Sequence, residues 1–130
     1  MKRLKLFLSS NDRYQRYSEI SEFIYPGETV LDVGGGEGII SRFTNNDITV
    51  LDINKKELTI AEISGAKIIS TDFNNNKLKD GSYDVVVSVS ALEHIPQEKR
   101  ENYLKELKRI SKKRIIIFTP TGSLKYDKIL

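Results

Sequence analysis

This chain of 130 residues contains no cysteine, a single histidine and no apolar run of the length needed to cross a membrane. The absence of cysteine excludes a disulfide framework, a thiolate metal site and a cysteine nucleophile. The opening segment, MKRLKLFLSS, is basic and then apolar, but it is too short for a signal-peptide core and lacks a cleavage motif. We therefore expect a cytoplasmic protein without a membrane segment.

The sequence also lacks internal repeats, low-complexity tracts and a strong charge imbalance. The formal net charge is only +3, and the basic residues are spread along the chain. Such a small excess is typical of a solvated surface and does not favour a nucleic-acid site. The length fits one domain over residues 1–130 and leaves no room for a separate substrate domain.

Five short apolar runs alternate with segments of helical character. Each run is continuously apolar, which is typical of strands in a parallel sheet that is buried on both faces. The pattern therefore predicts an α/β domain, with a further strand or extended arm at residues 4–8. The expected strands, numbered one to five, are residues 29–33, 48–53, 66–70, 83–88 and 114–119.

The first helix is expected after the N-cap candidates at residues 10–12, and it stops at the Pro-Gly pair that follows. Its Tyr14 and Tyr17, with Arg13 and Arg16, either reach a ligand or form an ordinary packed helix face. The remaining helices are expected at residues 39–44, at residues 54–63, and in a segment with Pro96 at its first position.

Polar and glycine-rich segments follow four of the expected strands where each strand ends. They are the turn after VLDV, Asp52, Asp72 and the segment 88–94. In an open parallel sheet these ends meet at one edge, where ligands bind. Glycines let the backbone approach a ligand closely, and free amides suit a polar or anionic group. The sequence therefore predicts a ligand site at this edge.

The glycine spacing separates two kinds of nucleotide-like ligand. A dinucleotide fold requires G-x-G-x-x-G, but position 39 is isoleucine and the third glycine stands at position 38. The string D-x-G-x-G-x-G, with VLDIN, STDFNNNKLKDGSYDVVVSVSALEHIP and RIIIFTP, resembles class I S-adenosylmethionine (SAM)-dependent methyltransferases over residues 10–120. The resemblance implies a three-layer, Rossmann-like parallel sheet in strand order 3-2-1-4-5, with helices on both faces. A dehydrogenase-type nucleotide module is the disfavoured alternative.

The resemblance implies that the glycine turn passes under the methionine part of SAM, where side chains would clash. Asp32 would hold the ammonium end of the cofactor or the turn itself, and Ser88 to Ser90 would lie beside the sulfonium. The alternative is that the glycines only permit a tight turn. The glycines concerned are Gly34, Gly35, Gly36 and Gly38.

The resemblance assigns the nucleoside part of SAM to residues after the second and third strands. Asp52 would accept both ribose hydroxyls, and Ile53 would pack on the adenine ring. Asp72 would accept the adenine amino group, and the Phe73 amide would donate to a ring nitrogen. The alternatives are that Asp52 caps the helix at 54, that Asp72 caps a loop turn, and that Phe73 is core.

Methyl transfer is an in-line displacement, and a hydroxyl acceptor usually also needs a base. His94 is the candidate catalytic base, with Glu93 beside it; alternatively, the two residues only brace the loop before Pro96. Some related methyltransferases hold a metal with E-x-x-E-H. Here Ser90 replaces the first glutamate, which leaves two ligands at most, so no metal site is expected.

The acceptor is expected to be a small molecule or glycan. The segment SVSA after the fourth strand lacks the N/D-P-P-Y/F of methyltransferases that modify amide or base nitrogens, and cytosine C5 chemistry needs a cysteine.

The family normally continues past strand five with a helix and two strands, for which residues 122–130 are too few. We expect a C-terminally short domain with strand five as an open edge, and a homodimer through that edge. The alternative is a non-catalytic SAM-binding module or truncated remnant.

Overall fold

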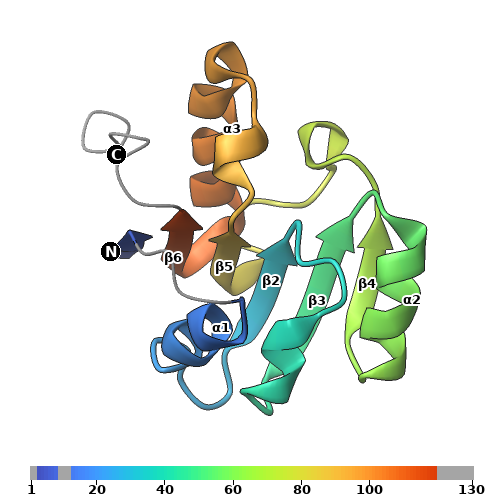
Figure 1. Ribbon diagram of the computed structural model, residues 1–130. Helices are drawn as coiled ribbons and strands as arrows, with labels where there is room; N and C mark the ends of the chain where they lie inside the picture. The colour runs from blue at the N-terminus through green and yellow to red at the C-terminus, as the bar shows by residue number, and fades with distance from the viewer. Residues whose placement is uncertain (1–2, 9–12, 120–130) are drawn as a thin grey trace.

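The computed structural model describes residues 3–8, as backbone, and residues 13–119. Six strands, three α-helices and three short 3₁₀ helices lie within these ranges (Figure 1). The elements are β1 (Arg3–Leu8), α1 (Arg13–Ser21), β2 (Thr29–Val33), η1 (Ile39–Arg42), β3 (Asp47–Asp52), α2 (Lys55–Ile63), β4 (Lys67–Ser70), η2 (Phe73–Asn75), β5 (Tyr83–Val89), η3 (Leu92–His94), α3 (Gln97–Ile110) and β6 (Ser111–Thr119).

The strands form one parallel sheet in the order β1-β6-β5-β2-β3-β4. Strands one to five of the prediction are β2 to β6, so the predicted order 3-2-1-4-5 is confirmed. The strand arrows lie side by side and point toward the same edge (Figure 1). The carboxyl ends of the strands therefore meet there, as the ligand-site prediction requires.

The expectation of an open edge at strand five is wrong. β1 pairs with β6 in parallel, from Arg3 opposite Arg114 to Leu8 opposite Thr119. The added strand covers the backbone groups that an exposed edge would present. A homodimer through the β6 edge therefore loses its basis.

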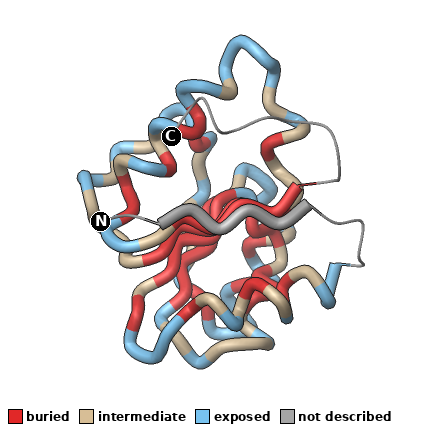
Figure 2. The backbone as a smooth tube through the Cα atoms, turned by 90° about the vertical axis from the view of Figure 1, so that its left-hand side faces the viewer, coloured by how far each residue is buried: buried red, intermediate tan, exposed pale blue. Residues whose placement is uncertain are grey.

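Side chains on the two faces of the sheet belong to two hydrophobic cores. In β5, Val85, Val87 and Val89 face α1, η1 and α2, whereas Val86 faces α3. Figure 2 shows the buried strands between segments that cover them from both sides. Full burial of one such side chain contributes about 1.5–3 kcal/mol. The continuous apolar runs are thus strands that supply both cores.

Helix boundaries follow local capping signals. The Asn54 side chain accepts a hydrogen bond from the Glu57 amide and starts α2, and Gly65 follows its last turn with φ +100°. Pro96 is the N-cap residue of α3 and not its first helical residue, which corrects the prediction by one position. The N-cap candidates at residues 10–12 lie outside the described residues.

Three further elements differ from the expectation by two or more residues. The segment after the glycine turn is a 3₁₀ helix of four residues, η1, and β6 begins at Ser111, three residues earlier than expected. α1 ends at Ser21, before the Pro-Gly pair. Within the described ranges, no helix is long and apolar enough to span a membrane.

Candidate functional site at the carboxyl ends of the strands

The turn after β2 depends on glycine at several positions. Gly34, Gly36 and Gly38 have φ of +71°, +54° and +71°, which L-residues rarely adopt. A Cβ on Gly38 would lie 3.0 Å from the Ala61 Cβ, so the turn also packs closely against α2. The Gly36 amide donates a 3.0 Å hydrogen bond to Oδ2 of Asp52, which ties the turn to the end of β3.

Asp32 lies directly beneath this turn. It is fully buried, a Cβ on Gly35 would overlap its carboxyl group, and no donor within the described structure meets hydrogen-bond geometry to either oxygen. Burial and the charge of Asp52 raise the pKa of Asp32 to about 8, although Arg13 and the Tyr17 hydroxyl act to lower it. A buried carboxyl group without a partner is costly. A cationic or hydrogen-bond-donating ligand at the turn would relieve this cost.

Two residues of α1 complete this part of the site. Tyr17 is buried, and burial followed by the Asp32 charge raises the pKa of its hydroxyl well above the usual value. Arg13 is exposed, and its Nη2 lies 3.6 Å from the place that a Cβ on Gly36 would take. Tyr17 therefore packs in the core and Arg13 reaches the glycine turn, while contact of this helix stripe with a ligand stays a prediction. The tyrosine–arginine spacing was the only sequence signal for them.

Asp52 and Ile53 lie at the end of β3, as the sequence placed them. The half-buried Asp52 accepts hydrogen bonds from the Gly36 amide through Oδ2 and, at 2.9 Å, from the Asn54 amide through Oδ1. Asn54, and not Asp52, supplies the side-chain cap of α2. Ile53 is 70% exposed, so its apolar surface is open to a ligand.

Asp72 and Phe73 follow β4. Asp72 is exposed, and its Oδ1 caps η2 by accepting a 3.0 Å hydrogen bond from the Asn74 amide. The Phe73 ring is buried and contacts Tyr103 edge to face, with 5.3 Å between the ring centroids. The alternatives of a loop cap and a core ring thus describe these side chains. Binding of adenine by Asp72 and the Phe73 amide stays a prediction.

The structure separates Ser88 from the open part of the edge. Ser88 is fully buried, and its Oγ lies 2.7 Å from the Tyr103 hydroxyl in a hydrogen bond. Ser90, two residues later, lies at the edge with φ +53°. Its hydroxyl accepts a 2.8 Å hydrogen bond from Nη1 of Arg16. No local sequence signal indicated the contact between Arg16 and Ser90.

His94 is an exposed residue at the end of η3, beyond the end of β5. The segment is held by Arg100, which donates to the carbonyl oxygens of Ile95 at 2.8 Å and of Glu93 at 3.3 Å. The Glu93 Oε1 is buried and has no hydrogen-bond partner within the described ranges. Among those same residues, no group of three or more acidic, histidine or cysteine side chains is arranged to hold a metal ion.

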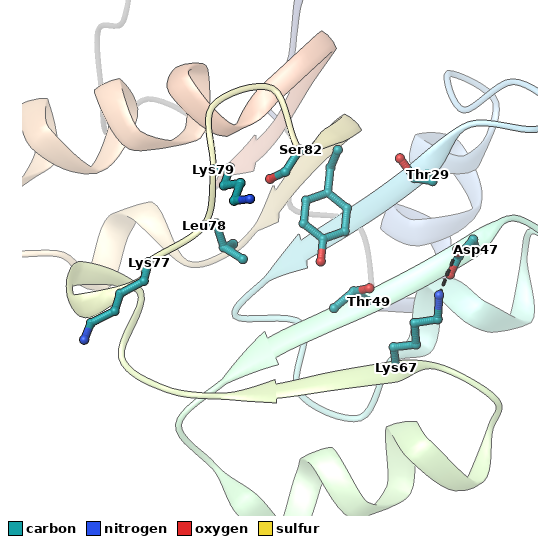
Figure 3. Close-up of a pocket in the computed structure, with 9 residues that line it drawn as sticks. Thr29, Asp47, Thr49, Lys67, Lys77, Leu78, Lys79 and Ser82 are labelled. Atoms are coloured by element: carbon teal, nitrogen blue, oxygen red, sulfur yellow. Dashed lines mark hydrogen bonds and ion pairs between the residues drawn. The ribbon is translucent and has the colours of Figure 1, made fainter.

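A cavity of about 430 Å³ lies at the opposite edge, where the strands begin (Figure 3). Lys67 points to Asp47 across the strand starts, with a 3.1 Å ion pair, and Lys77 extends away from the other labelled side chains. None of the sequence-predicted site residues lines this cavity. The lining residues are Thr29, Asp47, Thr49, Lys67, Lys77, Leu78, Lys79, Ser82 and Tyr83.

Comparison with known proteins gives concordant matches. Residues 31–118 match the family model described as "Methyltransferase domain". The chain is 38% identical over 97 residues to the 2-methyl-6-phytyl-1,4-hydroquinone methyltransferase of Synechocystis sp., covering 67% of this chain and 30% of that protein. It is 35% identical over 80 residues to the ubiquinone biosynthesis O-methyltransferase of Photobacterium profundum, a match that covers 54% of this chain and 34% of that protein.

A solved structure shares the fold. The magnesium protoporphyrin IX methyltransferase of Synechocystis PCC 6803, solved with bound SAM, superposes with a TM-score of 0.70 at 21% identity, over 80% of this chain and 57% of that chain. The chain spans about a third of the length of the two curated relatives.

Proposed function

The chain belongs to the methyltransferase domain family, and we propose that it transfers a methyl group from SAM to a small-molecule acceptor. The observation that carries the proposal is the buried Asp32 carboxyl group, which has no hydrogen-bond partner among residues 13–119 and lies under a turn that depends on glycine. When bound, SAM supplies an electrophilic methyl group on a sulfonium. The protein's task is then to bind, align and exclude water.

The residues around the turn fit the amino-acid part of SAM. Asp32 would receive the ammonium group, which supplies the donors that its oxygens lack. Arg13, beside Gly36, would face the carboxylate. A side chain in place of Gly35 would overlap the carboxyl group of Asp32, so the close approach needs glycine there. This fit supports a zwitterionic ligand over a phosphate, because a phosphate would meet the buried acid.

The residues after β3 and β4 fit the nucleoside part. Asp52 keeps free lone pairs on both oxygens after accepting two amide hydrogen bonds, so it would accept the ribose hydroxyls. The exposed Ile53 would cover one face of the adenine ring. Asp72 and the Phe73 amide would form hydrogen bonds with the edge of the adenine ring. Ser88 would contribute only through the backbone, because its hydroxyl is bonded to Tyr103.

The acceptor is proposed to be a small molecule that receives the methyl group on a hydroxyl oxygen. Relatives that match the chain include a ubiquinone biosynthesis O-methyltransferase, whose name specifies oxygen as the methylated atom. A hydroxyl acceptor needs a group that removes its proton, and the exposed His94 is the proposed base. A glycan hydroxyl is the second acceptor class that the same chemistry would serve.

Ligand binding and transfer test the proposal separately. Calorimetry with S-adenosylhomocysteine (SAH), NAD and ATP should give binding to SAH alone. Binding of NAD without SAH would replace this proposal with a dehydrogenase-type module. A radiolabelled transfer assay with SAM and a panel of phenols, hydroquinones and glycans should then give a labelled product, and His94→Ala should lower its rate. SAH binding with no product across the panel would identify a non-catalytic SAM-binding module.

A further inference from the structure

Ser90 has a strained backbone at the edge of the proposed SAM site. It is the one non-glycine residue with positive φ, +53°, in the part of the chain that the structure describes. The left-handed conformation brings the Cβ of an L-residue too close to the following carbonyl oxygen. Such strain persists only where surrounding contacts hold it, and it is common at functional sites.

Two other elements hold Ser90. Its amide donates a 2.7 Å hydrogen bond to the carbonyl oxygen of Phe118 in β6, and its hydroxyl accepts a 2.8 Å hydrogen bond from Arg16 of α1. The Arg16 guanidinium also lies over the Phe118 ring, 5.5 Å from its centroid. Arg16 is half-buried, so the packing fixes its side chain. α1, β5 and β6 are thus joined at one turn.

The conformation of Ser90 determines how the next residues enter the site. The Ala91 Cβ lies 3.5 Å from the place that a Cβ on Gly34 would take, so this turn contacts the glycine turn directly. Leu92 is fully buried in the core under α3, and the segment continues to His94. If the backbone at Ser90 relaxed, the wall formed by Ala91 and η3 would shift relative to the glycine turn.

We propose that Arg16 is a positioning residue that holds Ser90 in the left-handed conformation and thereby sets the wall of the SAM site. The consequence for ligand binding rests on the proposed function. Arg16 acts through Ser90 and does not contact the ligand. A glycine at position 90 adopts the same backbone without strain, so it makes the arginine dispensable.

Four variants test this role: Arg16→Ala, Ser90→Ala, Ser90→Gly and Arg16→Ala/Ser90→Gly. Ser90→Ala and Ser90→Gly both remove the hydroxyl, but only glycine adopts positive φ without strain. We expect Ser90→Gly to bind SAH about tenfold more tightly than Ser90→Ala, and Arg16→Ala to resemble Ser90→Ala. The double variant should bind as Ser90→Gly does. A double variant as weak as Arg16→Ala would overturn the proposal, because it would assign Arg16 a direct role.

A matched control and a second readout keep the test independent of stability and of the ligand. Arg42 donates to the Tyr14 hydroxyl at 3.2 Å and lies over its ring, so Arg42→Ala removes a similar arginine contact to α1 without touching Ser90. It should not change SAH affinity. In the free protein, hydrogen exchange of the Ser90 amide should quicken about tenfold in Arg16→Ala and Ser90→Ala but not in Ser90→Gly.

The two readouts separate the ways in which the proposal can fail. Equal exchange at position 90 in all variants would contradict the positioning role even if SAH binds. Absence of SAH binding by the unaltered chain, with the expected exchange pattern, would contradict the proposed function and leave the positioning of Ser90 by Arg16 supported.

Discussion

At the amino ends of the strands charged side chains are paired, whereas at the carboxyl ends of the same sheet several buried polar atoms have no hydrogen-bond partner among the described residues. Arg114 at the start of β6 binds Glu28 before β2 through two hydrogen bonds, 2.9 and 3.1 Å long. The same guanidinium lies over the Tyr25 ring, 4.5 Å from its centroid. This pair fastens the turn between α1 and β2 to the sheet.

A second network holds the loop before β5. Arg109 donates to Glu106, to Asp80 at 2.8 Å and to the Leu78 carbonyl oxygen at 2.6 Å. Hydrogen bonds from Arg109 are the main cause that lowers the pKa of Glu106, in spite of its burial. The loop that lines the cavity of Figure 3 is therefore fixed by charges that satisfy one another.

The carboxyl ends show the reverse condition. Asp32, the Glu93 Oε1 and the Thr119 hydroxyl lie buried there without a hydrogen-bond partner among the described residues, and Ser90 is strained. Native proteins retain such features mainly at functional sites. We infer that the amino ends of the strands stabilise the fold and propose that the carboxyl ends are arranged for a ligand. Variants at the two ends should therefore fail in different ways.

The largest expected effect is on stability at the amino end. Glu28→Ala leaves the Arg114 guanidinium, in a side chain only 13% exposed, without its carboxylate partner, which should lower the free energy of unfolding by about 3 kcal/mol. Urea denaturation measures the loss, and Glu101→Ala, in an exposed pair with Lys105, serves as control. SAH affinity of the folded variant should not change. A loss of affinity as large as the loss of stability would end the distinction between the two ends.

The next effect is on ligand binding at the carboxyl end. Asp32→Asn removes the carboxyl group that would release its proton on ligand binding and pair with the ligand ammonium, so SAH should bind about 100-fold more weakly. Stability at pH 7 should change little, since the variant removes a buried acid for which the described part of the chain supplies no hydrogen-bond partner. Calorimetry and urea denaturation of the same samples give both values. Unchanged SAH affinity would show that Asp32 does not meet the ligand.

The pH dependence of stability should have opposite signs at the two ends. The pKa of Asp32 is raised to about 8, so from about pH 4 to pH 8 the folded state keeps a proton that the unfolded state releases. Stability from this group falls as the pH rises, by about 2 kcal/mol between pH 6 and pH 8. Burial raises the pKa of Glu28, but hydrogen bonds from Arg114 and the Tyr25 amide outweigh it and lower the pKa. Its contribution is instead lost as the pH falls through that lowered pKa.

Urea denaturation at several pH values checks this sign. The unaltered chain should lose stability from pH 6 to pH 8, and Asp32→Asn should flatten the curve. An identical slope in the variant would mean that another group carries the dependence.

The smallest effect is expected at an exposed pair. Asp47 and Lys67 form a 3.1 Å ion pair at the starts of β3 and β4, with side chains 50% and 71% exposed. Solvent screens such a pair, so Asp47→Ala should cost roughly 0.5 kcal/mol or less in urea denaturation. It should leave SAH affinity unchanged, although Asp47 lines the cavity of Figure 3. A measurable change in affinity would link that cavity to the ligand.

The sequence predicted those parts of the fold that have local signals. β2 was predicted at Thr29–Val33 and observed there, because a continuous apolar run ends at a glycine turn. The pairing of β1 with β6 was missed, because about 110 residues separate the two strands and an apolar segment does not specify its partner. The Arg114–Glu28 pair, 86 residues apart, has no local signal for the same reason.

The site was predictable where motif spacing placed backbone and carboxylates, and less so for side-chain direction. Asp32, Asp52 and Ile53 lie where the pattern indicated. The alternation of side chains along β5 puts Ser88 on the face of Val86, toward α3, and the motif spacing does not include this signal. The strain at Ser90 had no sequence signal, because serine does not favour positive φ. The residue that holds Ser90, Arg16, comes from another element.

A titration of the ¹⁵N-labelled chain with SAH, followed by amide chemical shifts, tests the central claim most directly. We expect shifts at Gly34–Gly38, at Asp52 and Ile53 and at Phe73, with no change at residues 77–83 beside the amino-end cavity. Shifts confined to residues 77–83, or none at saturating SAH, would contradict the claim that the carboxyl ends of the strands form the ligand site.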